Sequence, residues 1–390
     1  MKSKSLLVNW LIGLLVLPFG MQCFGQDTLL YNNRKLIQVV LQNKDTLLAT
    51  VDTITNDTTT SFFYPSPIIP TLNNSTFTNS VNLNSSLAVK ELNNFYTRKN
   101  IFSDSIITEA QRKKRIKLVT AANVIGYGGA MVGLYSAWYK DYPQGKFRFF
   151  NDNREWLQVD KIGHIYSAYI ESKASMEVWR WAGLPRKQRI WIGGLSGAAY
   201  QTVIEVLDGF SRDWGWSWGD FTANMLGSGL LVSQELLWDE QRIDLKFSFH
   251  KQNYAEPMLN KRADSVFGKS VLNRMLKDYN GQTYWLSANL KSFFPKSKLP
   301  AWLNIAVGYG AEGMYGAEQN RWKDAQGNQI NRTDIPRYRQ WYIAPDINLT
   351  KIKTKSKFLK TAFFFFNSFK FPLPSIGFSQ KGVEWNWLHF

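Results

Sequence analysis

The sequence predicts an α+β protein: a four-helix, membrane-associated bundle over residues 110–240, followed by an antiparallel β-rich region over 241–390. Two observations predict this division. The first region contains long apolar stretches with closely spaced glycines, which end at helix stop signals. The second contains short runs rich in aromatic and β-branched residues that alternate in polarity, as strands do.

The chain begins with a predicted secretory signal peptide, residues 1–25. Lys2 and Lys4 precede an apolar run from Leu6 to Phe19, and cleavage is expected after Gly25. An uncleaved membrane anchor is the alternative. We therefore expect an exported protein on the periplasmic face of the envelope, associated with the outer membrane.

The chain has one cysteine, Cys23, and it lies within this first segment. Gln22 precedes it, whereas a lipid-anchored cysteine normally follows a small residue, so lipidation at Cys23 stays open. Cleavage after Gly25 leaves a mature chain without cysteine, which excludes disulfides, thiol catalysis and cysteine-based metal sites.

The net charge is +17, from 47 basic and 30 acidic residues. An exported protein seldom meets nucleic acid, so we expect no nucleic-acid partner. Membrane lipid or an anionic envelope glycan fits this charge better, and the 16 Trp, 17 Tyr and 26 Phe suit a membrane–water boundary. Simple solubilising charge is the alternative, and no protein partner is predicted.

Residues 26–109 are predicted to hold short strands and a linker. Two runs, Lys35–Leu41 and Thr46–Val51, are expected to pair as strands. The segment 52–90 is rich in Asn, Thr and Ser and contains three prolines in its middle, so it is expected to be a linker or weakly ordered.

The helical region starts at a basic cluster, residues 112–117, that runs into 21 uncharged residues from Leu118 to Trp138. That length would span a bilayer. The positive-inside rule argues against a simple span, because export would place the basic cluster outside the cytoplasm. We expect this helix to pack in the bundle or to meet a membrane surface. Three further helices are predicted over Asp160–Trp181, Lys187–Leu207 and Asp220–Trp238, with an ordered loop over Gly209–Gly219.

The C-terminal region is predicted to form a compact antiparallel sheet packed against the helices. Its aromatic C-terminus resembles the terminal strand of outer-membrane barrels, but the strands are too few for a complete barrel. Strands are expected over Asp244–His250, Thr283–Phe293, Ala301–Gly310, Gln340–Leu349 and Ile376–Leu388. A helix is expected over Leu259–Leu276, and Ser356–Asn367 suits either a strand or an amphipathic helix.

Polar residues within the apolar helices predict a shared polar site. Asp160 and His164 are four residues apart on one helix face, so the carboxylate can orient the imidazole. The predicted cluster consists of Asp160, Lys161, His164, Glu205, Asp208, Asp220 and Asn224, and the glycines expected to allow close helix packing are Gly163, Gly194, Gly197 and Gly227.

Each member also has a structural explanation. Asp160 and Asp220 are placed as helix N-caps, and Asp208 can shape a helix C-terminus. Glu205 is surrounded by apolar residues and needs a partner, for which Lys161 or Arg212 is expected.

No catalytic residue, metal centre or cofactor is assigned. The three histidines are far apart in sequence, and no phosphate loop, dinucleotide fingerprint or nucleophile elbow is present. Carboxylate-bound Ca²⁺ or Mg²⁺ on Glu205, Asp208 and Asp220 stays open, although no loop signature predicts it.

These motifs resemble a known family. Asp160-Lys161-x-x-His164, Glu205-x-x-Asp208-Gly209-Phe210 and Ser217-x-x-Asp220-x-x-x-Asn224-x-x-Gly227 are similar to the predicted periplasmic lipoproteins of unknown function of the YfiM type. They are more distantly similar to the VanZ-like membrane proteins, in which a Gln stands where this chain has Asp208. The composition and signal resemble envelope proteins of Bacteroidetes. The resemblance covers about 110–240 and implies an envelope location and a helical domain with a polar centre, without a reaction.

Three functions are carried forward. The first is an envelope protein of unknown activity that is membrane-associated and binds a lipid headgroup or glycan or serves a structural role. The second is a hydrolase or transferase acting on a phospholipid, lipopolysaccharide or cell-wall precursor, with His164 as acid or base. It requires the polar groups to converge beside an open pocket. The third is an accessory component of an outer-membrane assembly.

Overall fold

The computed structural model describes residues 38–43, 46–50, 107–134, 144–212, 215–254, 256–324 and 326–389. The chain divides into two compact units, Gly20–Arg98 and the remainder. In the first, β1 (Gln38–Asn43) pairs antiparallel with β2 (Thr46–Thr50), as predicted. The predicted signal peptide with Cys23, the linker over 52–90, the last four residues of 118–138, Trp214 and Phe390 lie outside the described residues.

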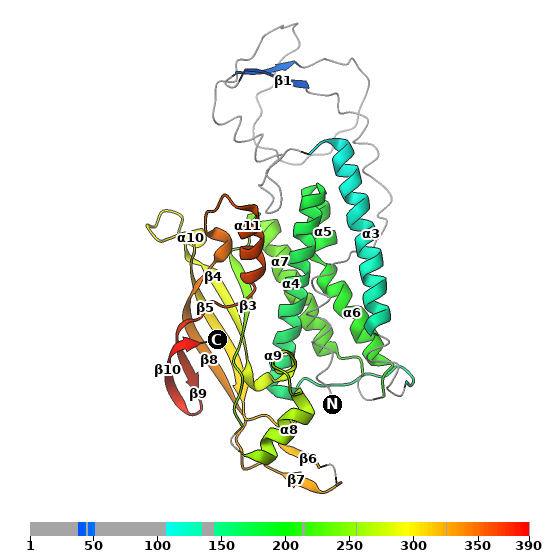
Figure 1. Ribbon diagram of the computed structural model, residues 1–390, viewed down its shortest axis with the longest axis vertical. Coiled ribbons are helices and arrows are strands. Elements are labelled where there is room, and N and C mark those ends of the chain that lie inside the picture. The colour runs from blue at the N-terminus through cyan, green and yellow to red at the C-terminus, as the bar shows by residue number, and fades with distance from the viewer. Residues whose placement is uncertain are drawn as a thin grey trace, which may run out of the picture. The chain divides into compact units, whose positions relative to one another are not determined.

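The helical region is arranged around one central helix, α4 (Val159–Ala182) (Figure 1). It contacts α3 (Glu109–Leu134), α5 (Arg186–Gly194), α6 (Ser196–Gly209) and α7 (Trp218–Trp238). The basic cluster forms the first turns of α3. Among the described helices, none combines the length and the apolar character needed to cross a membrane.

The prediction of one helix over Lys187–Leu207 was wrong, because the chain breaks at Leu195 into α5 and α6. Hydroxyl groups of the neighbouring helices satisfy the backbone at this break. Ser172 Oγ accepts the amide of Gly197 at 3.0 Å, and Ser228 Oγ accepts the amide of Ala198 at 2.9 Å. The region predicted as four helices therefore has five between 109 and 238 in the described residues.

The C-terminal region contains one antiparallel sheet of six strands in the order β10-β9-β8-β5-β4-β3. The strands are β3 (Ile243–Phe249), β4 (Gln282–Asn289), β5 (Leu303–Glu312), β8 (Tyr338–Ile347), β9 (Leu373–Ser379) and β10 (Gly382–His389). A short hairpin of β6 (Arg321–Lys323) and β7 (Gln329–Asn331), which was not predicted, joins β5 to β8. The mixed helix-and-sheet class and the antiparallel C-terminal sheet are thus confirmed.

Several predicted boundaries in this region were wrong, since turns interrupt the expected elements. The run 376–388 forms the hairpin β9–β10, which turns at Gly382 with φ +111°. The helix predicted over 259–276 is two, α8 (Pro257–Phe267) and α9 (Val271–Lys277), separated at Gly268 with φ +84°. The strand predicted over 283–293 ends at β4 and continues as the short helix α10 (Leu290–Phe293). The ambiguous segment is a helix, α11 (Lys357–Phe366).

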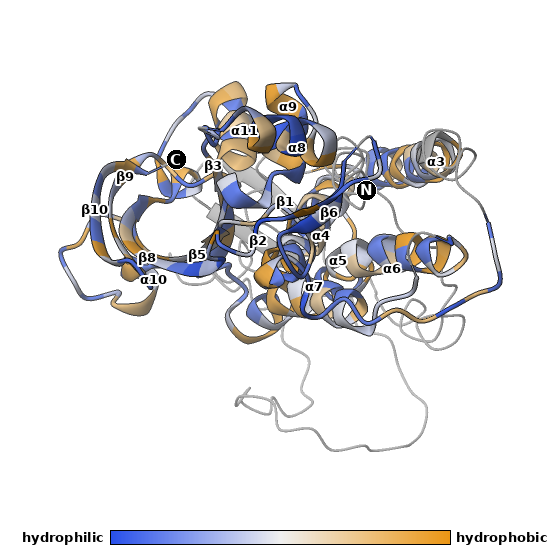
Figure 2. Ribbon diagram, turned by 90° about the horizontal axis from the view of Figure 1, so that it is seen from below, coloured by the Kyte–Doolittle hydropathy of each residue, from blue (hydrophilic) through white to orange (hydrophobic). Residues whose placement is uncertain are grey.

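The sheet is strongly curved, and its strands follow one another around an arc (Figure 2). On the concave face, His389 at the end of β10 comes within 3.3 Å of Thr283 on β4 and packs edge-on to Trp285. Small residues permit this curvature: a Cβ at Gly308 would lie 2.7 Å from the Trp285 ring, and one at Gly377 would lie 2.9 Å from the Tyr342 ring.

The two faces of the sheet differ in composition. The concave face is buried and mixed: a small apolar cluster of Trp285, Ala306, Tyr342 and Ala344 lies beside an ion pair of 2.7 Å between Lys246 and Asp346, both fully buried. Ser287 donates to Asp346, and Asn304 donates to Ser287. The convex face is apolar. Part of it, around Phe247 and Tyr284, is covered by Tyr166 and its neighbours on α4, which forms the main core.

The rest of the convex face is exposed. The exposed apolar side chains on it are Leu286, Ile305, Val307, Trp341, Ile343, Ile376, Phe378, Val383 and Trp385. Folded proteins rarely expose apolar side chains over an area as large as five neighbouring strands. Where they do, the apolar patch usually marks an interaction surface.

Candidate functional site

The predicted polar residues come together where α4, α6 and α7 meet the segment before α4. Lys161 is the centre of this polar cluster. Its Nζ lies 2.6 Å from Asp220 Oδ1, 2.8 Å from Asp152 Oδ1 and 3.2 Å from Asp160 Oδ2. One ammonium therefore joins three carboxylates from three segments of the chain.

His164 occupies the next turn of α4. Its Nδ1 is 3.1 Å from Asn224 Oδ1, and its Nε2 is 3.6 Å from Asp220 Oδ1. Glu205 lies behind it, with Oε1 4.0 Å from Nδ1, and accepts the amide of Ser217 at 3.4 Å. The helix spacing that placed Asp160 and His164 on one face thus brings His164 to both α6 and α7.

Two details of the predicted contacts were wrong. Asp160 is the second residue of α4, and the N-cap of α7 is Ser217, whose Oγ accepts the amide of Asp220 at 3.1 Å. Lys161 pairs with the aspartates and not with Glu205, which instead lies close to His164 and the Ser217 amide. Arg212 is exposed, and no contact between it and Glu205 is found among the described residues.

Three residues that were not among its predicted members complete the cluster: Asp152, Ser217 and Tyr279. Asp152 precedes α4 and accepts from Ser217 Oγ at 2.6 Å. Tyr279, from the short helical turn before β4, donates to Asp160 Oδ1 at 2.7 Å. The Ser217-x-x-Asp220 spacing is a capping signal that could have identified Ser217, whereas no sequence pattern pointed to Asp152 or Tyr279.

The turn that leads into α4 is strained. Trp156, Leu157 and Gln158 have φ values of +49°, +50° and +65°, a left-handed conformation that non-glycine residues rarely adopt. Trp156 is buried against Phe267 and Tyr279. The packing of this ring holds the turn, and the turn positions Asp160 and Lys161 at the start of the helix.

The glycines predicted for close packing lie at helix contacts. A Cβ on Gly197 would lie 2.1 Å from the Ala168 carbonyl oxygen, and one on Gly227 would lie 2.1 Å from that of Ile165. Gly194 faces the Val232 side chain, and Gly163 is buried on α4. These contacts let α6 and α7 approach α4 closely enough for the polar side chains to meet.

The cluster contains more carboxylates than cations. Four acids, Asp152, Asp160, Glu205 and Asp220, face one lysine and one histidine. Burial would raise the pKa of Asp160, but the charges of Lys161 and His164 and the Tyr279 hydrogen bond lower it to about 2. Asp152 behaves similarly: its pKa is lowered by Lys161 and Ser217 despite burial.

Burial raises the pKa values of Asp220 and Glu205, and the excess negative charge raises them further. Burial raises the pKa of Asp220 to about 7, with Asp160 and Asp152 adding to the effect and His164 and Lys161 opposing it. Burial, Asp220 and the half-buried Asp208 raise the pKa of Glu205 well above its usual value. For Lys161, burial favours the neutral form, but the three aspartates outweigh it and raise its pKa. The cluster therefore holds a proton on one or more carboxyl groups near neutral pH.

This proton can be detected as a pH-dependent stability. Because the pKa of Asp220 is raised on folding, its contribution is present below about pH 4 and is lost as the pH rises through about 7. We expect Asp220→Asn to remove that loss, so that between pH 5 and 7 the variant gains about 2 kcal/mol relative to the wild type in urea unfolding. The control is Asp239→Asn, which removes an acid at the other end of α7, and its free energy of unfolding should change with pH as that of the wild type does. If the unfolding free energy of Asp220→Asn also changed with pH as in the wild type, Asp220 would carry no proton.

A cation could reach part of this cluster, but a lysine already does so. Asp160, His164 and Asp220 place potential ligand atoms within 4.8 Å of one another, a set different from the predicted Glu205, Asp208 and Asp220. The Lys161 ammonium contacts two of those three residues. It neutralises the carboxylates that Ca²⁺ or Mg²⁺ would need, so the donor set fits a lysine better than a divalent ion.

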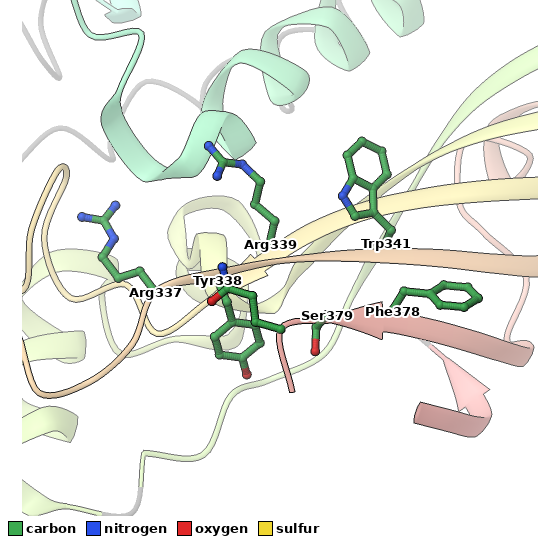
Figure 3. A pocket seen from close by; sticks show the side chains of 7 residues that line it. Arg337, Tyr338, Arg339, Trp341, Phe378 and Ser379 are labelled. Atoms are coloured by element: carbon green, nitrogen blue, oxygen red, sulfur yellow. The ribbon is translucent and has the colours of Figure 1, made fainter. Parts of the chain in front are cut away.

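A second polar feature is an open pocket at the ends of β8 and β9 (Figure 3). Arg337, Arg339, Trp341 and Phe378 line it. Arg339 and Arg337 point to the same side of the strand (Figure 3). Burial and the Arg339 charge lower the pKa of Arg337. This pocket borders the exposed convex face of the sheet.

Comparison with known proteins identifies one similarity. Residues 148–234 match the protein family described as predicted periplasmic lipoprotein (DUF2279). The match contains every member of the predicted polar cluster and confirms the resemblance to the predicted periplasmic lipoproteins. The distant similarity to VanZ-like membrane proteins and the likeness to envelope proteins of Bacteroidetes stay predictions. No curated protein and no solved structure matches the chain.

Proposed function

We propose that the protein is a non-catalytic component of the cell envelope that works at a membrane surface. The match of residues 148–234 to predicted periplasmic lipoproteins supports the envelope location. The observation that carries the proposal is the exposed convex face of the sheet. Trp341, Phe378 and Trp385 are 51%, 39% and 54% exposed on neighbouring strands, where water contact is unfavourable.

Lipid explains this face better than a second copy does. Each chain carries a charge of +17, so two copies repel one another, whereas anionic lipid is attracted. Aromatic side chains beside arginines, as at Trp341 and Arg339, suit the boundary between hydrocarbon and headgroups.

The polar cluster then has a structural role: it holds α4 and α7 to the turn before α4 and to Tyr279 of the C-terminal region. The hydrolase or transferase hypothesis required the same groups beside an open pocket. The groups converge, but their side chains are only 3–15% exposed. A closed and largely paired arrangement favours stabilisation over turnover.

The test is retention on isolated membranes during washing with high salt (about 1 M NaCl), which screens purely ionic attachment. Wild type should stay with the membranes. The triple substitution Trp341→Ser, Phe378→Ser and Trp385→Ser should lower membrane partitioning about 100-fold, because three large apolar contacts are lost.

The matched control replaces three exposed apolar residues of the helical region, Trp191, Leu226 and Leu237, by Ser. We expect it to remain bound. Release of the control while the triple variant stays bound would move the contact to the helices and contradict the proposal. Release of the wild type as a monomer by mild salt, or as a stable dimer, would contradict the proposal.

A further inference from the structure

A second exposed surface lies at one end of the curved sheet, where two connecting segments meet. Residues 290–302 follow β4, and residues 348–366 follow β8 and include α11. We call these two segments the basic–aromatic rim. The registers Asn289↔Asn304 and Leu303↔Ile347 place both at the same end of the strands, where α10 and α11 lie (Figure 1).

Hydrogen bonds join the two segments into one surface. The amide of Asn348 donates to the Trp302 carbonyl at 2.8 Å. Glu240 accepts from Ser292 Oγ at 3.0 Å and also from Lys351 Nζ. The rim is therefore held in place by contacts from the end of the helical region.

The charge of the rim has one sign. Its two segments contain eight lysines and neither an aspartate nor a glutamate. Five of the lysines are exposed: Lys296, Lys298, Lys353, Lys355 and Lys357. Basic residues at the beginning of a helix oppose the helix dipole, so Lys355 and Lys357 at the start of α11 are not placed there for helix stability.

Exposed phenylalanines lie among these lysines. Phe294, Phe358 and Phe366 are 60%, 78% and 62% exposed, while Phe364, which also belongs to α11, is buried. Lysines whose only role is to keep the protein soluble do not explain the exposed phenylalanines, because exposed aromatic rings lower solubility. An amphipathic helix with lysines and outward aromatic rings is typical of a segment that lies in the headgroup region of a membrane.

We propose that the basic–aromatic rim binds anionic phospholipid, with the lysines on headgroup phosphates and the phenylalanines in the acyl-chain boundary. The proposal rests on the proposed function, because it names the lipid class that the membrane must present. Charge complementarity selects the occupant: lysine clusters beside a membrane contact are attracted to negatively charged leaflets.

The experiment measures binding of the purified full chain to two vesicles, phosphatidylcholine alone and phosphatidylcholine with about 30 mol% phosphatidylglycerol. The rim variant replaces Lys298, Lys353, Lys355 and Lys357 by Gln. The matched control replaces Lys251, Lys261, Lys269 and Lys323 by Gln, which are also exposed and change the net charge equally. Three of these four lie on or beside α8, α9 and β6, away from the rim.

We expect the rim variant to bind phosphatidylglycerol vesicles about 100-fold more weakly than wild type, and the control to change less than about threefold. Equal losses in both variants would indicate a general effect of net charge and would overturn the proposal, as would an unaffected rim variant. Wild type that bound both vesicles equally would overturn it while leaving the proposed function intact. Wild type that bound neither vesicle would reject both.

Two further measurements identify the occupant. Phe358→Ser with Phe366→Ser should make binding to phosphatidylglycerol vesicles fully reversible by salt, because only the ionic part remains. A soluble anionic polysaccharide at equal charge should compete weakly. Complete competition would assign the rim to a glycan and overturn the assignment to lipid.

Discussion

Lys161→Met is expected to lower the free energy of unfolding by about 3–5 kcal/mol at pH 7, the range found when one partner of a buried ion pair is removed. The Lys161 side chain is only 12% exposed, and its ammonium is the one cation within 3.2 Å of Asp152, Asp160 and Asp220 in the described structure. Without it, three buried carboxylates face one another. Urea unfolding followed by circular dichroism measures the change.

The pH dependence separates this mechanism from a loss of packing. In the wild type the pKa of Asp160 is lowered to about 2, so its contribution is present above about pH 4 and is lost as the pH falls. In Lys161→Met the carboxylates take up protons more readily. The loss of unfolding free energy relative to the wild type should therefore be smaller at pH 5 than at pH 7. Lys187→Met, at an exposed lysine of α5, should stay within about 0.5 kcal/mol of wild type. A deficit of equal size at pH 5 and pH 7 would argue for packing instead.

Gly227→Ala is expected to destabilise the protein by about 3 kcal/mol, the upper end of the usual cost of overpacking. The added methyl would lie 2.1 Å from the carbonyl oxygen of Ile165 and 3.1 Å from the amide nitrogen of Tyr169. Both are backbone atoms of α4 and cannot rotate away, so α7 must move outward. That movement also separates Asn224 from His164 and Asp220 from Lys161.

Gly229→Ala is a matched control on the same helix. A Cβ at Gly229 would meet nothing within 4 Å, so this substitution should stabilise α7 by about 0.5–1 kcal/mol through reduced backbone freedom. The two changes alter the unfolded chain equally, and their opposite signs isolate the helix contact. Thermal unfolding of both variants tests this, and a Gly227→Ala variant as stable as Gly229→Ala would show that α4 and α7 are not closely packed.

Much of the polar cluster could be predicted from residue spacing. Asp160 and His164 lie on one face of α4 because they are four residues apart, and Asp220 and Asn224 repeat that spacing on α7. The partners could not be predicted, since they depend on how each helix is rotated and where it begins. Asp160 and Asp220 were expected to be N-caps, yet Ser217 caps α7, and this shift of three residues directs Asp220 towards Lys161.

The members contributed by distant segments were invisible in the sequence. Tyr279 is 119 residues from Asp160 and joins it only because the turn before β4 packs beside the start of α4. Similarly, the break at Leu195 depends on Ser172 and Ser228, which supply acceptors from other helices to the start of α6.

The sequence by itself determined the division into a helical region followed by strands, the alternation along the main strands and the helix-borne residues of the polar cluster, because local spacing controls which side chains share a face. Only the tertiary structure decided which face is buried. Alternation does not reveal the direction of curvature. Here the sheet closes around the face that carries Lys246, Asp346 and His389, and it leaves Trp341 and Phe378 outside. The physical reason is that burial is a property of packed neighbours, and those neighbours come from other segments of the chain that local spacing does not report.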